Sequence, residues 1–176
     1  GGHNTAFGKG AGDAITTASH NTAIGSHSLG TNTTGQYNTA VGREALFGNT
    51  TASNNTALGN RALYSDTTGS KNIAVGNYAL DALTTSDNNV AMGYNAASSL
   101  TTGSENTALG TSALYTSTTA NNNTAVGYQS LYYNTDGGEN TAVGKNALVL
   151  NTTAHNNTAV GYHSLHNNTT GQRNTS

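Results

Sequence analysis

The sequence predicts an all-β protein: a parallel β-solenoid or β-roll with one 17-residue repeat per coil and about ten coils. Two observations predict this fold. Asparagine recurs every 17 residues from Asn4 to Asn174 without an insertion, so each unit is one structural step that packs on copies of itself. The units are rich in Asn, Thr and Gly, which disfavour helix interiors, and this excludes a coiled coil or an α-solenoid.

The repeats form a single array over residues 1–176. The units start at Asn4, Asn21, Asn38, Asn55, Asn72, Asn89, Asn106, Asn123, Asn140, Asn157 and Asn174. The chain begins at Gly1 and its only methionine is Met92, so we expect the array to be an excerpt of a longer fibre.

We number the positions of a unit as slots 1 to 17, beginning at this Asn; the consensus is N-T-A-φ-G-x-x-(A/S)-L-x-x-N-T-T-(G/A)-x-x, where φ is apolar. Slots 1 to 5 alternate as a strand does, which puts slots 2 and 4 on one face and slots 1, 3 and 5 on the other. Gly at slot 5 and a small residue at slot 15 mark the corners of the coil. Stacking predicts a ladder of Asn amides at slot 1 and a ladder of Thr hydroxyls at slot 13.

The balance of energies predicts association. Burying the aliphatic of slot 4 and the Leu of slot 9 supplies about 4 kcal/mol per coil. Ordering the backbone costs about 1–2 kcal/mol per residue, so a lone rod is marginal. The face of Ala at slot 3 and Gly at slot 5 allows close approach of other backbones, and we expect a parallel homotrimer packed through it. The alternative is that these small residues fit a narrow coil interior.

The strand motif also carries a resemblance. Asn38-Thr39-Ala40-Val41-Gly42, with Ala or Ser three residues after the Gly, resembles the S-V-A-I-G-x-x-S/A repeats in the head domains of trimeric autotransporter adhesins. It is also similar to the N-T-A-V-G-x-x-A-L arrays of phage-type tail-fibre proteins. The resemblance covers nearly the whole chain, although the adhesin unit is shorter, about 14 residues. It implies a left-handed β-roll, three chains side by side, and an extracellular fibre on a cell or virion surface.

Composition excludes several functions. Only 8% of residues are charged and the net charge is −2, so no basic face exists for nucleic acid. There is no cysteine and no apolar run of about 18 residues, so we expect no disulfide, no Cys-ligated zinc and no membrane insertion within this segment. The acidic residues do not recur as pairs, and His3 with His20, or His163 with His166, lack a third ligand. We therefore expect no enzyme, no cofactor and no metal site.

The variable slots are expected on the outside, and their tyrosines are the candidate binding residues. Tyr94, Tyr128 and Tyr162 share slot 6, and Tyr64, Tyr115 and Tyr132 share slot 10. Tyrosine gives rigid amphipathic contact to a cell-surface glycan or protein; the simpler interpretation is that these rings cover the flanks of the rod.

Glycosylation sequons also recur. The candidates are Asn32, Asn49, Asn151 and Asn168, and Asn54, Asn122, Asn156, Asn167 and Asn174 also begin sequons. An Asn/Thr-rich repeat generates sequons by composition alone, so we expect most to be unmodified.

Three functions remain open. The leading one is a structural or adhesive shaft of an extracellular fibre or filament, because an array without insertions suits a presenting rod. The second is an ice-binding β-solenoid that uses Thr ladders, although the adjacent Thr residues of slots 13 and 14 are expected to point to opposite faces. The third is a carbohydrate-active solenoid, which the lack of clustered acids disfavours.

Overall fold

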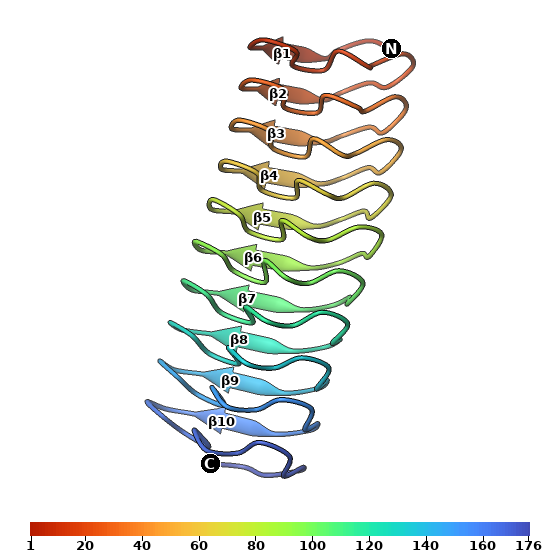
Figure 1. Cartoon of the computed structure of the whole chain (residues 1–176). Helices are drawn as coiled ribbons and strands as arrows, with labels where there is room; N and C mark the ends of the chain where they lie inside the picture. Colours follow the sequence, from red (N-terminus) through yellow and green to blue (C-terminus); the bar gives the residue numbers. More distant parts are fainter.

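The computed structural model describes residues 1–176 and shows the expected all-β parallel solenoid (Figure 1). Ten short strands form one parallel sheet in the order β1 to β10, one strand per coil. The strands are β1 Thr5–Phe7, β2 Thr22–Ile24, β3 Thr39–Val41, β4 Thr56–Leu58, β5 Ile73–Val75, β6 Val90–Met92, β7 Thr107–Leu109, β8 Thr124–Val126, β9 Thr141–Val143 and β10 Thr158–Val160. No helix suited to spanning a bilayer is present.

Each strand pairs with the next at an offset of one repeat. Ala40 of β3 lies opposite Ala57 of β4, and Ala57 lies opposite Ala74 of β5. Every slot therefore stacks on its own copies along the rod, at the strand spacing of about 4.8 Å.

The coil interior is narrow and filled by small residues. The Ala of slot 3 is at most 1% exposed from Ala23 to Ala159, and each Leu of slot 9 from Leu29 to Leu148 is 0% exposed. The Ala or Ser of slot 8 packs beside that Leu in the core. The small-residue face of the strand is thus internal, and the expectation that it contacts other chains is wrong.

The aliphatic residues of slot 4 lie on the outside, contrary to the expected burial. Phe7 is 75% exposed, Met92 45% and Val160 61%, and none of the ten slot 4 residues is buried. The reason is steric: Ala from slot 3, Leu from slot 9 and the small residue of slot 8 already fill the space between the two walls of a coil.

A ladder of buried Asn side chains at slot 1 is confirmed. The Asn38 Nδ2 donates to the carbonyl of Ala52 at 2.8 Å, and its Oδ1 accepts from the backbone N–H of Asn55 at 2.9 Å. Direct amide-to-amide bonds also occur, as from Asn123 Nδ2 to Asn106 Oδ1 at 3.2 Å. These bonds satisfy polar groups that would otherwise be costly to bury.

The Thr ladder of slot 13 differs from the expected hydroxyl-to-hydroxyl arrangement. The hydroxyl of Thr33 donates to the backbone carbonyl of Thr50 at 2.9 Å, and Thr50 donates to the carbonyl of Thr67 at 3.1 Å. The side chains of slot 13 therefore fasten one coil to the next through the backbone.

Three slots adopt left-handed backbone conformations, and slot 5 requires glycine. The non-glycine residues of slots 7, 9 and 17 have positive φ, for example Leu46 at 51° and Tyr37 at 58°. The first coil carries Gly10 and Gly12 at two of these slots, with φ of 66° and 63°, which explains its glycine-rich sequence. At slot 5, Gly93 has φ of 142°, and a Cβ there would lie 2.5 Å from the carbonyl oxygen of Gly110.

Candidate functional site

The outer face of the ten-stranded sheet is the largest regular surface of the chain. We call it the strand face; it consists of the side chains of slots 2 and 4. Slot 2 is Thr in eight of the ten strands, and Ile73 and Val90 replace it in β5 and β6. The slot 2 hydroxyls have no partner within the chain, unlike Thr33 of slot 13, which donates to Thr50. The strand face is thus a flat array of free hydroxyls beside an aliphatic column.

The slot 6 tyrosines stand exposed beside this face, as the sequence predicts. Tyr94 is 53% exposed, Tyr128 47% and Tyr162 71%. The ammonium of Lys145 lies 5.7 Å from the ring centroid of Tyr128 and 5.9 Å from that of Tyr162, within cation–π range of both. These rings occupy alternate coils, and Lys145 fills the interval between the last two.

The slot 10 tyrosines are more enclosed, at the turn that follows slot 5. Tyr115 and Tyr132 stack with centroids 5.0 Å apart, and Tyr64 stacks on Phe47 at 5.5 Å. Loss of solvent, and then the neighbouring phenols of Tyr115, Tyr133 and Tyr128, raise the pKa of Tyr132. Aromatic stacking between coils is therefore the structural role of these rings.

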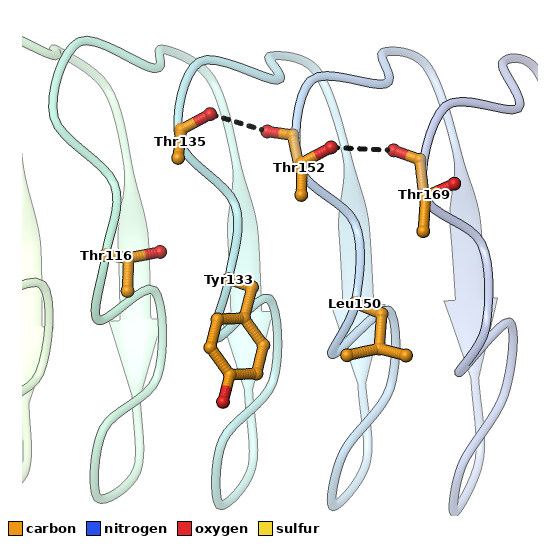
Figure 2. Close-up of a pocket in the computed structure, with 6 residues that line it drawn as sticks. All are labelled: Thr116, Tyr133, Thr135, Leu150, Thr152 and Thr169. Carbon is orange, nitrogen blue, oxygen red and sulfur yellow. Dashed lines mark hydrogen bonds between the residues drawn. The ribbon is translucent and has the colours of Figure 1, made fainter.

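A shallow open groove on the opposite wall was not predicted. It has a volume of about 490 Å³ and runs between slots 11 and 13 of neighbouring coils, as Figure 2 shows. Its lining residues are Thr116, Tyr133, Thr135, Leu150, Thr152 and Thr169. Thr135 and Thr152 donate their hydroxyls to the carbonyls of Thr152 and Thr169, so their methyl groups remain to line an apolar groove.

The groove residues Tyr133 and Leu150 carried no sequence signal because slot 11 varies from coil to coil. The apolar character of the Thr side chains was also hidden. It depends on the direction of each hydroxyl, which is set by a carbonyl of the next coil.

Two acidic side chains have perturbed environments. Burial raises the pKa of Asp66 to about 8, although a hydrogen bond from the Gly69 backbone opposes this and the charge of Asp87 adds to it. Burial also raises the pKa of Asp81, against the effect of Arg61, whose Nε lies 3.3 Å from Asp81 Oδ1. The Arg61 guanidinium also lies 4.1 Å from the ring centroid of Tyr64. Asp66 and Asp81 stand on different walls and form no acid–base pair.

The histidines form aromatic stacks. The rings of His3 and His20 are 5.0 Å apart, and His20 stacks on Tyr37 at 5.1 Å. His163 and His166 lie 4.5 Å apart. No group of three or more His, Cys, Asp or Glu side chains is placed to hold a metal ion.

Three of the four glycosylation candidates are interior. Asn32, Asn49 and Asn151 are 0% exposed, and each amide nitrogen donates to the carbonyl three residues ahead, as Asn49 does to Ala52 at 3.1 Å. This correction follows from the direction of slot 12, which points inward and leaves no room for a glycan on the folded coil. Asn168 is only partly buried, in the last complete coil.

Comparison of the chain with protein-family models, with curated proteins and with solved structures gives no match.

Proposed function

We propose that this chain is a shaft segment of an extracellular fibre, structural and adhesive, in which parallel copies assemble as a trimer through the strand face. The single observation that carries the proposal is the unbroken aliphatic column of slot 4, which runs through all ten strands and is buried in none. A continuous apolar strip on an otherwise polar rod is typical of an interaction surface. The resemblance of the strand motif to adhesin and tail-fibre repeats supports the same assignment.

The energy available matches assembly of a long array. Covering a half-exposed aliphatic side chain contributes about 1 kcal/mol, so the whole column contributes on the order of 10 kcal/mol per chain. Association costs an estimated 4–15 kcal/mol in lost translational and rotational freedom. One or two coils therefore cannot associate, whereas ten stacked coils can.

The assembly is tested by the mass of the purified chain in solution, measured by light scattering, with electron microscopy of the same sample. We expect a trimer, or a thin filament of trimeric cross-section. V143D, on the strand face, should dissociate it, whereas T153D, an exposed substitution at slot 14, should not. A folded monomer of the unmodified chain would refute the proposal.

A second function has a specific observation in its favour. The free hydroxyls of slot 2, one per coil and about 4.8 Å apart, lie beside the aliphatic column on a flat sheet. Such a regular array of hydroxyls and methyls suits an ice surface, and it differs from the Thr ladder considered from the sequence. An isolated monomer that inhibits ice recrystallisation, and loses this activity in T124K, would support it over the fibre.

The adhesive part of the proposal rests on the exposed slot 6 rings. We propose that Tyr94, Tyr128 and Tyr162 contact a cell-surface glycan or protein. Binding to a glycan array or to cells that Y128A/Y162A loses, and that Y115A in the enclosed stack retains, would support this role. Equal binding by the unmodified chain and Y128A/Y162A would refute it.

A further inference from the structure

We propose that neighbouring copies in the assembled shaft meet edge to edge, in register, and that Glu139 of one copy forms an ion pair with Lys145 of the next. This inference rests on the proposed assembly through the strand face and specifies its polarity and its register.

Two exposed columns border the strand face. Slot 17, immediately before each strand, is exposed in every coil from His3 to Arg173. Slot 6 follows the glycine corner on the other side, and its residues are exposed or partly exposed. In the coil of β9, Glu139 stands at the first edge and Lys145 at the second, with Thr141–Val143 between them.

Symmetry determines which residues meet. In a closed cyclic assembly all copies stand at the same height, and a rotation parallel to the rods brings one edge of each copy against the opposite edge of the next. The slot 17 residue of a coil therefore faces the slot 6 residue of the same coil in the neighbouring copy.

The charges at these levels are compatible throughout. Glu139 faces Lys145, which is the only level with opposite charges, and Tyr37 faces Arg43, a pair suited to a cation–π contact. The other charged residues face uncharged or imidazole side chains: Lys9 with His3, Lys71 with Asn77, and Glu105 with Thr111. No level brings two carboxylates or two Lys or Arg side chains together.

Glu139 and Lys145 are also free to pair. The ion pairs within the chain are Arg43 with Glu44 at 2.7 Å and Arg61 with Asp81 at 3.3 Å, so neither Glu139 nor Lys145 is engaged. Both side chains are exposed. The rings of Tyr128 and Tyr162 flank the Lys145 ammonium at 5.7 Å and 5.9 Å, which restricts the side chain at this edge. A restricted cation loses less entropy when it pairs.

Other arrangements do not form this pair. A shift of one coil places Asn122 or Asn156 opposite Lys145. An antiparallel pair of copies brings slot 6 against slot 6 and slot 17 against slot 17. The contact between Glu139 and Lys145 therefore reports both the parallel direction and the register.

Cysteine cross-linking tests the contact directly, because the chain has no cysteine of its own. In E139C/K145C, an intervening extended strand keeps the two thiols of one chain too far apart for a disulfide, which requires Cα atoms within about 7 Å. We expect oxidation of the assembled variant to give covalent trimers on non-reducing gels. The matched control N122C/K145C, one coil out of register, should remain monomeric on the same gels.

Charge reversal gives a second measurement. E139K and K145E should each raise the protein concentration at which the assembly half-dissociates by about tenfold, and E139K/K145E should restore it. A trimer that cross-links through N122C/K145C, or that is insensitive to both E139C/K145C oxidation and charge reversal, overturns this inference alone. A monomer in light scattering overturns both this inference and the shaft proposal.

Discussion

Replacing Asp66 by asparagine should remove most of the dependence of this chain's stability on pH. Asp66 occupies slot 12, where Asn49 stands one coil earlier, and it is 0% exposed. Its Oδ1 accepts from the Gly69 backbone at 2.9 Å and its Oδ2 accepts from Asn55 Nδ2 at 3.2 Å. An ionised carboxylate cannot also donate to the Gly69 carbonyl, as the amide of Asn49 donates to Ala52.

The sign and size follow from the raised pKa. Burial is the main cause that raises the pKa of Asp66 from 3.8 to about 8. Between these two values the folded chain holds a proton that the unfolded chain has released, so stability is full below pH 4 and declines as the pH rises towards 8. The slope is about 1.4 kcal/mol per pH unit, and the free energy of unfolding is about 4 kcal/mol lower at pH 7 than at pH 4.

The assay is urea unfolding followed by circular dichroism between pH 4 and pH 9. D66N should match the unmodified chain near pH 4, exceed it by about 4 kcal/mol at pH 7, and show a much flatter profile. Asp81, whose pKa burial also raises, accounts for a smaller slope of the same sign that D66N retains. The control E105Q alters an exposed carboxylate and should keep the original slope. A D66N profile parallel to that of the unmodified chain would refute the argument.

Three further predictions concern the coil itself. G93A should lower the free energy of unfolding by about 3 kcal/mol or more, because φ is 142° and the new Cβ would lie 2.5 Å from the Gly110 carbonyl oxygen; G2A, with no atom within 4 Å, should leave the melting temperature unchanged. N106A should cost about 2–4 kcal/mol in urea unfolding, because it removes the donor to the Ala120 carbonyl at 2.8 Å and the acceptor of the Asn123 N–H at 3.0 Å; N122G at an exposed corner should cost only a few tenths, and equal losses would contradict the ladder argument. After expression in a glycosylating host, peptide mass spectrometry should find Asn32, Asn49 and Asn151 unmodified, and any glycan should sit on the exposed Asn54, Asn122, Asn156 or Asn167; an occupied Asn49 in folded protein would show that slot 12 is not interior.

The repeat period alone was sufficient to predict the fold and its register. An offset of 17 residues without slippage is the same quantity as the pairing of Ala40 with Ala57, so the strand ladder follows from counting. The buried Asn ladder followed for the same reason. Corners at slot 5 were also predictable, since glycine is invariant where φ is positive and coils approach closely.

Which strand face lies inside was harder to predict. Alternation separates slots 2 and 4 from slots 1 and 3 but does not say which set is internal, and the larger apolar residues were placed there. A better signal was present in the variation between units: slot 3 is always Ala, whereas slot 4 ranges over Phe, Ile, Val, Leu and Met. A packed interior tolerates little change of volume, so the invariant slot is the internal one.

The inward direction of slot 12 had a signal as well. An Asn whose side chain bonds to the backbone three residues ahead forms a local turn, as Asn32 does with the N–H and carbonyl of Gly35. The groove beside Tyr133 had no such signal. It depends on where the hydroxyls of Thr135 and Thr152 point, and only the stacked backbone of the next coil determines that.

The same packing argument explains why the chain has an apolar surface to offer. A coil of 17 residues encloses one Leu and a few small residues, while its Asn side chains fill the rest of the interior with hydrogen bonds. Enlarging the interior side chains would push the walls apart and break the ladders that link each coil to the next. Further apolar burial is therefore possible only outside, and the slot 4 column is where the sequence places it. Adding coils lengthens that column in proportion, so the free energy of association should grow with the length of the array while the interior of each coil stays the same.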